Sequence, residues 1–369
     1  MNVYYYHLGD IPKFLEAYHA GKMPSHLLYG ALQLPKHGIH VIFHQAPYNP
    51  CRWKQSLRTA WEVLRQYPHF DALYVTQFRG MELIIYLRAL GLFRKPVVVW
   101  HHTPIVRSAN PVREILARLF YRGMDQVIFF SRHIYEESLK SVKANPKRMN
   151  VVPWGADLEY YDRIKRTVAS ENAEVLEASD SVESPDTASK SGFISSGIEN
   201  RDMDTLVEAF NATGAPLDIY VSEQYNGTDY RKWFSRLHTE ENIHVHFIQH
   251  FEHRELTAIV CQHAGIAICC KETNYTVGLT TLVEAFALGI PVICSNNPQI
   301  PVDIAGSECG ITPAYYDATA WETAIRRLQE HPDVAQEMGR KGRLLAEKEY
   351  NIEVCAARVA EILRRTKKR

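Results

Sequence analysis

Short runs of apolar residues alternate along the chain with stretches of helical spacing. The runs are rich in Val, Ile, Tyr and Phe and are continuous rather than alternating with polar residues, which is typical of parallel strands buried on both faces. In the first half, the predicted strands are Val3–Leu8, His40–His44, Ala72–Thr76, Val97–His101, Gln126–Phe130 and Asn150–Val152. In the second half, they are Phe193–Ser195, Leu217–Val221, His244–Ile248, Ile266–Cys270 and Val292–Cys294.

The segments between these runs, such as 111–123 and 202–212, carry helical periodicity. Alternating strands and helices predict α/β units around parallel sheets. Residues 165–191 are rich in Ser, Glu, Asp and Ala and hold no aromatic residue, so we expect a flexible acidic linker there. The predicted organisation is an N-terminal domain over 1–164, the linker over 165–191, a C-terminal domain over 192–350, and a terminal helix with a basic tail over 351–369 that returns to the first domain.

Composition narrows the class of protein. The 369 residues are 46% hydrophobic and 23% charged, which excludes disordered, collagenous and disulfide-scaffold proteins and fits two domains. The seven cysteines form no C-x-x-C pair and lie mostly in apolar runs, as reduced and buried thiols do. We find no secretory signal and no apolar run long enough to span a bilayer, so we expect a cytoplasmic protein.

The formal net charge of zero conceals an uneven distribution. Residues 1–166 hold 23 Lys and Arg against 12 Asp and Glu, while residues 167–369 hold 19 against 30. Many of the basic residues gather in the segment 94–148. They indicate either an anionic partner or an ordinary solvated surface. Nucleic acid is disfavoured as that partner, because no helix-turn-helix, zinc or RNA-binding signature accompanies the charge.

The stretch 270–297 carries the clearest chemistry. A strand ends there, a loop with Gly278 leads through Thr280 and Thr281 into a helix that contains Glu284, and another strand follows. A glycine loop at a helix N-terminus offers unpaired N–H groups and a positive dipole end to a phosphate. Glu284, one turn further along, suits ribose hydroxyls. The alternative is an ordinary capped helix.

Residues 278–295, GLTTLVEAFALGIPVICS, resemble the donor-binding segment of retaining glycosyltransferases of the GT-B fold, in glycosyltransferase family 4 (group 1). The resemblance extends to 193–210, to 151–157 and to the helical stretch 322–363. It implies two Rossmann-like parallel-sheet domains facing each other across a cleft. It also implies a nucleotide diphosphate sugar as donor, bound mainly by the second domain.

The resemblance assigns residues one at a time. Glu284 matches the second glutamate of the family's paired-glutamate motif, which binds the donor ribose, whereas Thr276 replaces the first glutamate. Gly278, Thr280 and Thr281 would then hold the diphosphate with their hydroxyls and amides.

The family's usual Gly-Arg pair reads Gly197–Ile198 in this chain. We therefore expect Gly197 to approach the phosphates, and Arg201 or Lys271 to supply the positive charge unless these are solvated surface cations. The triplet 202–204, Asp-Met-Asp, is more simply explained by a helix N-cap than by a metal site, and we expect no metal and no cofactor.

In the first domain, His101 and His102 follow a predicted strand, at the edge of the sheet where open α/β sheets bind ligands. The resemblance implies that a histidine here faces the donor sugar, with His102 preferred and His101 second. No G-x-G-x-x-G fingerprint of a dinucleotide site occurs.

The expected function is metal-independent transfer of a sugar, with retention of anomeric configuration, to a hydroxyl acceptor. That acceptor would be a glycan or a lipid-linked saccharide, as in polysaccharide biosynthesis. The basic first domain would meet an anionic membrane surface, which makes the protein peripheral on the cytoplasmic face. Two alternatives stay open: a nucleotide-sugar epimerase, and a non-catalytic partner subunit that binds a nucleotide sugar.

Overall fold

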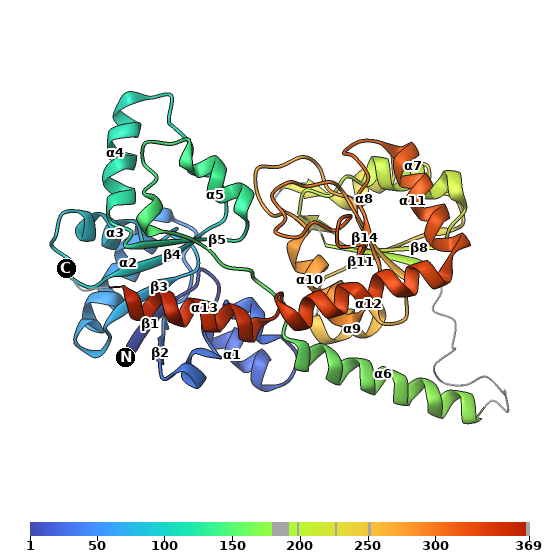
Figure 1. Ribbon diagram of the computed structural model, residues 1–369, viewed down its shortest axis with the longest axis horizontal. Coiled ribbons are helices and arrows are strands. Elements are labelled where there is room, and N and C mark those ends of the chain that lie inside the picture. The colour runs from blue at the N-terminus through green and yellow to red at the C-terminus, as the bar shows by residue number, and fades with distance from the viewer. Residues whose placement is uncertain (179–191, 198, 226, 250–251, 367–369) are drawn as a thin grey trace. The chain divides into compact units, whose positions relative to one another are not determined.

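The computed structural model describes residues 1–178, 192–197, 199–225, 227–249 and 252–366. The chain divides into two compact units. The first comprises Met1–Gly155, Asn274–Thr276 and Asn351–Arg369, and the second comprises Ala156–Thr273 and Val277–Tyr350. Each unit is built on one six-stranded parallel sheet flanked by helices (Figure 1).

The sheet of the first unit has the strand order β2-β1-β3-β4-β5-β6. Its strands are β1 (Asn2–Tyr6), β2 (His40–Phe43), β3 (Ala72–Val75), β4 (Val97–His101), β5 (Gln126–Phe129) and β6 (Met149–Val151). Every residue of β3 and β4 is buried, as expected for strands covered on both faces. Apolar burial on both faces therefore explains why these runs are continuous.

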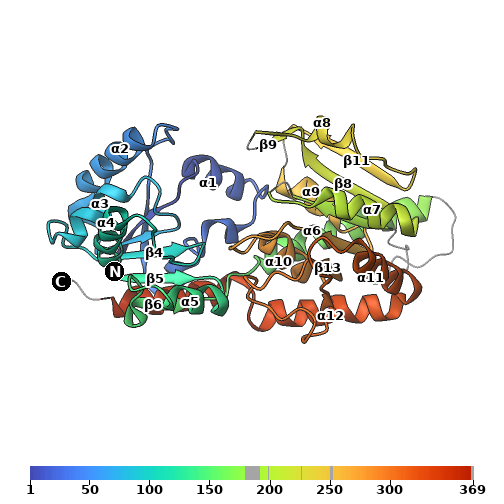
Figure 2. The ribbon, with the colours of Figure 1, turned by 90° about the horizontal axis from the view of Figure 1, so that it is seen from above.

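Helices cover both faces of this sheet. They are α1 (Ile11–His19), α2 (Arg52–Arg65), α3 (Glu82–Ala89), α4 (Pro111–Arg122), α5 (Arg132–Leu139) and α13 (Ile352–Arg365). Short 3₁₀ turns occupy Ser25–Leu28, Leu34–His37, Tyr67–His69 and Pro146–Arg148. Helices α2 to α5 share one core with the sheet, and α2, α3 and α4 lie side by side (Figure 2). Helix α13 packs instead on the 3₁₀ turn Leu34–His37.

The sheet of the second unit has the order β11-β8-β7-β12-β13-β14. Its strands are β7 (Phe193–Ser196), β8 (Leu217–Ser222), β11 (Ile243–Ile248), β12 (Gly265–Ile268), β13 (Val292–Cys294) and β14 (Gly310–Ile311). A small hairpin of β9 (Gln224–Tyr225) and β10 (Thr228–Asp229) stands apart from it. The predicted strands are all present, whereas the short β9, β10 and β14 were not predicted.

In the second unit, the first helix precedes the first strand, and the other helices alternate with or follow the strands. The helices are α6 (Leu158–Ala178), α7 (Met203–Thr213), α8 (Tyr230–Phe234), α9 (His253–Val260), α10 (Leu279–Leu288), α11 (Ala318–Glu330) and α12 (Pro332–Lys348). The expected fold class, two Rossmann-like α/β domains, is confirmed.

The linker expected over 165–191 has to be corrected in its first part. Helix α6 continues through it to Ala178, and residues 179–191 lie outside the described part of the chain. The helix forms because Ile164 and Val168, four residues apart, are both buried, and because Ala, Glu and Leu favour helix over 171–178. Composition alone concealed this apolar stripe. The division of the chain also places α6 in the second unit.

Candidate functional site

The order of strands in the second unit reverses between β7 and β12. The chain leaves β7 toward β8 on one side, and later returns to β12 on the other side. Ligands of open α/β sheets bind beyond the carboxyl ends of strands at such a switch point. Gly197 and Arg201 follow β7, and Cys270 and Lys271 follow β12, so the residues predicted to meet phosphate surround this point.

Arg201 is buried at the switch point, with 4% of its surface exposed. Its Nη1 donates to Cys270 Sγ at 3.1 Å, and its Nη2 donates to the Ser196 carbonyl at 3.1 Å and to Thr281 Oγ1 at 3.2 Å. All of these acceptors are neutral. Its Nε is buried without a hydrogen-bond partner.

In the described part of the chain, Arg201 therefore forms no ion pair with a carboxylate. The carboxylate of the neighbouring Asp202 caps α7 instead, where its Oδ1 accepts from the Thr205 amide. A buried cation without a counter-ion is costly in free energy. An anionic ligand bound at this point would supply the counter-ion for the guanidinium.

Gly197 gives the guanidinium its space, and Gly278 allows the backbone to pass close to Ile268. Gly197 has φ +106°, and a Cβ built there would lie 2.4 Å from Arg201 Nη2. Gly278 has φ +87°, and a Cβ there would lie 2.7 Å from Ile268 Cγ2 and 3.9 Å from Arg201 Nη1. Both positions combine a left-handed backbone with a close approach, so both require glycine.

Gly278 is also the N-cap of α10, and no side chain caps that helix. The amides of its first turn are thus open to a ligand, and the helix dipole adds positive potential there. Thr280 is exposed in this turn, whereas Thr281 is buried against Arg201. The structure brings Gly197, Arg201, Gly278 and Thr281 together, with Thr280 on the same turn as Thr281.

Glu284 lies one turn further along α10 and is 8% exposed. Its Oε1 accepts from Thr257 Oγ1 of α9 at 3.0 Å. Burial raises the pKa of this carboxyl to about 7, and the Thr257 hydrogen bond opposes that rise only in part. Thr257 was not predicted as a site residue, because nothing in the sequence connects two helices this far apart.

Lys271 is turned away from the guanidinium. Its Nζ lies 4.5 Å from the centre of the Trp233 ring on α8, and its amide donates to the Asn200 carbonyl. The structure therefore places Lys271 on the same strand end as Cys270 but outside the direct contacts of Arg201.

In the first unit, the two histidines after β4 differ sharply. His101 is buried, and its ring nitrogens lie 2.5 Å from the Thr103 carbonyl and 2.8 Å from Tyr121 Oη. His102 is half-buried, and its Nε2 lies 3.0 Å from Tyr29 Oη. Burial lowers the pKa of each imidazole to about 4, so both are neutral at pH 7. His101 is held by structural contacts, and His102 is the more accessible of the two.

Two successive hydrogen bonds fix Tyr29, the residue that contacts His102. Trp100 Nε1 donates to Tyr74 Oη at 2.7 Å, and Tyr74 Oη donates to the Tyr29 carbonyl at 2.6 Å. Tyr29 itself has φ +53°, an unusual conformation for a bulky residue. Tyr29 was not predicted, since it lies far from His102 in sequence.

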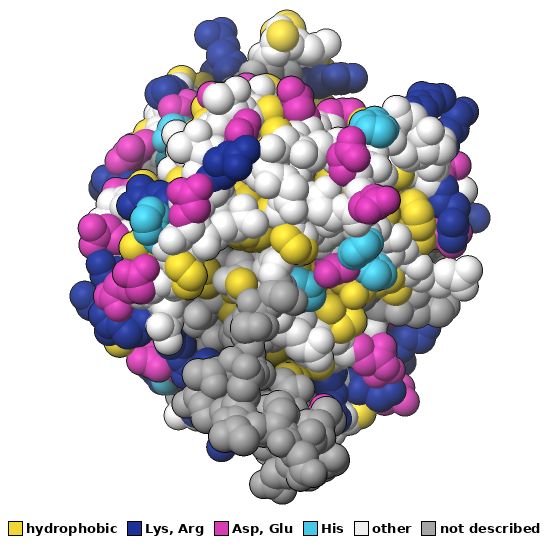
Figure 3. All heavy atoms as spheres, turned by 90° about the vertical axis from the view of Figure 1, so that its right-hand side faces the viewer, with side chains coloured by type: hydrophobic (Ala, Val, Ile, Leu, Met, Phe, Trp, Pro, Cys, Tyr) yellow, Lys and Arg dark blue, Asp and Glu magenta, His cyan; other side chains and the backbone are white. Residues whose placement is uncertain are grey.

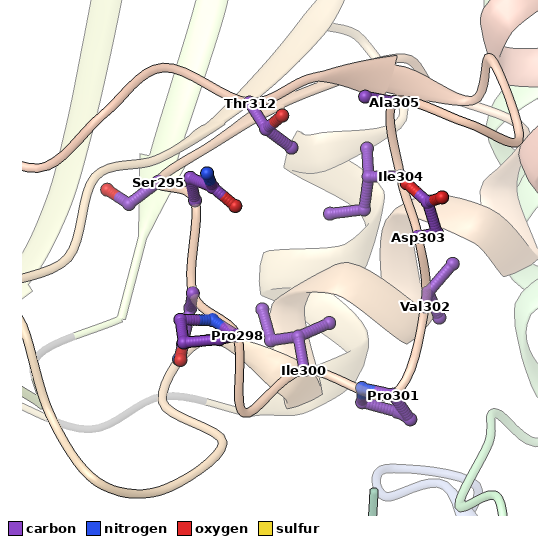
Figure 4. A pocket seen from close by; sticks show the side chains of 11 residues that line it. Ser295, Pro298, Ile300, Pro301, Val302, Asp303, Ile304, Ala305 and Thr312 are labelled. Carbon is purple, nitrogen blue, oxygen red and sulfur yellow. The ribbon is translucent and has the colours of Figure 1, made fainter. Parts of the chain in front are cut away.

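A pocket of about 260 Å³ opens where β13 ends. The connection between β13 and β14 supplies most of its walls (Figure 4). Its lining residues are Ser295, Asn296, Asn297, Pro298, Ile300, Pro301, Val302, Asp303, Ile304, Ala305 and Thr312. None of them was predicted as a site residue, and none is among the hydrogen-bond partners that the described residues give Arg201.

No group of three or more His, Cys, Asp or Glu residues is arranged to hold a metal ion in the ranges that the structure describes. Within the same ranges, no helix is both long and apolar enough to cross a bilayer.

Comparison with known families identifies the chain. Residues 23–160 match the family model of Glycosyltransferase Family 4, and residues 177–345 match that of Glycosyl transferases group 1. The chain therefore belongs to the glycosyltransferases that these two models describe, family 4 (group 1). No curated protein matches its sequence.

Several solved structures share the fold at low sequence identity. A sucrose-phosphate synthase from Thermosynechococcus elongatus is 14% identical with a TM-score of 0.72, over 98% of each chain. Anabaena HepE in complex with UDP-glucose is 12% identical with a TM-score of 0.69, over 99% of each chain. A trehalose-phosphate synthase from Burkholderia xenovorans is 13% identical with a TM-score of 0.62, over 86% of this chain and 79% of the other. These likenesses confirm the GT-B fold.

Proposed function

We propose that this protein transfers a sugar from a nucleotide diphosphate donor to a hydroxyl acceptor, with retention of anomeric configuration. The observation that carries the proposal is the buried Arg201 guanidinium, whose hydrogen-bond partners among the described residues are all neutral. A diphosphate would complete it with charge-assisted hydrogen bonds. HepE has been crystallised with UDP-glucose and with UDP, which supports a nucleotide sugar as the donor.

The donor would be held along α10. The first-turn amides after Gly278 and the hydroxyl of Thr280 suit the diphosphate, and Glu284 suits the ribose hydroxyls. In the reaction, a bond forms between the acceptor oxygen and the anomeric carbon as the bond from that carbon to the donor phosphate breaks. The acceptor's proton passes to the departing phosphate oxygen. Arg201 and the amides stabilise the charge that develops on the diphosphate, so we propose that no metal or cofactor is required.

His102 would orient the donor sugar rather than remove a proton. Its neutral imidazole and its contact with Tyr29 suit a hydrogen-bonding role. We propose a glycan or lipid-linked saccharide as acceptor, as in polysaccharide biosynthesis. We further propose a cytoplasmic, peripheral location in which the basic first domain meets an anionic membrane.

Incubation with a panel of nucleotide sugars, including UDP-glucose, tests the proposal. We expect one donor to raise the thermal midpoint and to be consumed when saccharide or lipid-linked acceptors are added, with product followed by mass spectrometry. Absence of nucleotide binding across the panel would contradict the donor site. Binding without hydrolysis or transfer would favour a non-catalytic subunit, the alternative to which Thr276 points. Conversion of the donor to a stereoisomer would indicate an epimerase.

A further inference from the structure

Helix α2 of the first unit presents its bulky apolar side chains to solvent. Trp53, Leu57, Trp61 and Leu64 are 62, 53, 71 and 48% exposed. Their spacings of four, four and three residues place them on one face of the helix. Residues at such spacing normally form the side of a helix that packs on the core.

The opposite face of α2 is fixed to the domain by polar contacts. Gln55 and Thr59 are buried and hydrogen-bonded to each other, and Gln55 Oε1 accepts from the Asn49 amide at 2.7 Å. The carboxylate of Glu62 accepts from the amides of Gln45 and Ala46 at 2.7 and 2.8 Å. These contacts hold the helix in this rotation, so the exposed stripe is a fixed feature of the surface.

A row of basic side chains runs beside the stripe. Lys54, Arg58 and Arg65 are exposed, and at 100° per residue they lie along one flank of the apolar face. Lys54 Nζ lies 5.6 Å from the Trp53 ring. Glu62 is the only acidic residue in α2, and its contacts point away from this face. Trp and Leu beside Lys and Arg is the composition of helices that lie in a membrane interface.

The second unit has no comparable surface. Of its described residues, only Tyr316 and Leu344 are large hydrophobic side chains that are exposed, and they stand alone in sequence. On the face drawn in Figure 3, acidic, basic and histidine side chains are interspersed. Among the described residues, a helix with such an exposed apolar stripe is therefore particular to the first unit.

We infer that α2 is a membrane-docking helix that inserts Trp53, Leu57, Trp61 and Leu64 into the headgroup region of an anionic bilayer. Lys54, Arg58 and Arg65 contact the lipid phosphates. The charge of this row favours anionic lipid over a neutral protein groove. The inference rests on the proposed function, because a lipid-linked acceptor would lie in the membrane to which α2 binds. The sequence alone pointed to the basic segment 94–148 as the membrane-binding surface, whereas the inference assigns membrane binding to α2.

Tryptophan fluorescence with vesicles tests the inference on the full chain. Trp100, Trp154 and Trp321 are buried and Trp233 is partly buried, so the two exposed tryptophans, Trp53 and Trp61, should dominate the response to lipid. We expect a blue shift and co-sedimentation with vesicles of phosphatidylcholine and phosphatidylglycerol, weakened by salt, and much less of both with phosphatidylcholine alone. Equal binding to both vesicles, or to neither, would overturn the inference.

Variants separate the two parts of the surface. Trp53→Ser and Trp61→Ser should each lower vesicle affinity about tenfold. Substitution of Lys54, Arg58 and Arg65 by Glu should lower the vesicle affinity by about five-fold for each positive charge that is lost. Leu344→Ser and Arg327→Glu, exposed positions of the second unit, are matched controls that should leave binding unchanged. If the tryptophan variants instead change the oligomeric state and leave vesicle binding intact, the stripe is a contact between copies and the inference is wrong.

Measuring nucleotide binding in the absence of vesicles distinguishes a failure of this inference from a failure of the proposed function. The α2 variants should bind the donor as the wild type does. Vesicle binding without any nucleotide binding would contradict the proposed function and leave the docking helix standing.

Discussion

The two units differ in whether a buried arginine has a charged partner. In the first unit, the buried Arg88 forms a bidentate ion pair with Asp125, with both N–O distances at 2.8 Å. In the second unit, the equally buried Arg201 donates to neutral acceptors in the part of the chain that the structure describes. Charges that stabilise a fold are paired within it, whereas a charge left unpaired at a ligand-binding edge marks where a ligand supplies the partner.

The acidic residues repeat this contrast. In the first unit, Glu114 accepts from the Ser108 amide and from Lys143 Nζ, and these contacts lower the pKa of its carboxyl to about 2. In the second unit, burial raises the pKa of Glu284 to about 7. Within the described residues, neither Arg201 nor Glu284 forms an ion pair, and both contact or belong to α10, so the contrast singles out one helix.

Removal of Arg88 should have the largest effect. Arg88→Met leaves Asp125 buried without its partner, which costs about 3–5 kcal/mol of stability. We expect a lower unfolding midpoint in urea and, in the fraction that stays folded, unchanged donor affinity. Nucleotide binding lost in proportion to the folded fraction would agree with this. A specific loss of binding by folded protein would contradict the assignment of Arg88 to stability.

The same substitution at Arg201 should act in the opposite direction. Arg201→Met removes a buried cation that has no counter-ion, so the ligand-free protein should unfold at an equal or higher temperature. Donor affinity should fall at least about a hundredfold, because charge-assisted hydrogen bonds contribute about 1.5–3 kcal/mol each. Calorimetric titration with UDP-glucose and thermal unfolding measure both. Wild-type affinity in this variant would remove the main support for the phosphate site.

Glu284 should give the second unit a distinct pH dependence. Its folded-state pKa of about 7 exceeds the ordinary value of 4.5, so the folded state holds the proton more tightly. This contribution to stability is complete below about pH 4.5 and is lost as the pH rises through about 7, by roughly 3 kcal/mol in all. Glu284→Gln should lack that loss when urea unfolding is compared at pH 5 and pH 8.

Donor affinity gives a second test of Glu284. The carboxylate form accepts hydrogen bonds from ribose best, so wild-type affinity should rise between pH 6 and pH 8, and that rise should disappear in Glu284→Gln. Glu284→Ala with unchanged nucleotide affinity would show that this carboxylate does not meet the ribose.

Gly197→Ala tests whether the space beside the guanidinium matters, and Gly214→Ala is its matched control. Both glycines have positive φ, so both substitutions should cost about 1 kcal/mol in backbone strain. A Cβ at Gly214 meets nothing within 4 Å, whereas one at Gly197 meets Arg201. Only Gly197→Ala should therefore weaken donor binding. Equal affinities in the two variants would show that the position of the guanidinium is unimportant.

The sequence predicted the sheets well, because strands buried on both faces leave continuous apolar runs such as Val97–His101. It also placed Arg201, Gly278 and Thr281 in one site through the resemblance of their segments to a known family. Thr257 and Tyr29 escaped prediction, since their roles arise from contacts between distant segments. The helical course of 165–178 was missed because a polar composition concealed two buried aliphatic residues.

Helix α13 has a consequence for the order in which the molecule is made. It belongs to the first unit, where it buries Cys355, Ala356 and Val359, yet it follows the second unit in sequence. During synthesis the first unit therefore waits, with the surface around Gly30 uncovered, until the second unit has emerged and can fold. The N-terminal half is thus synthesised first but gains its last helix only after the second unit has been made.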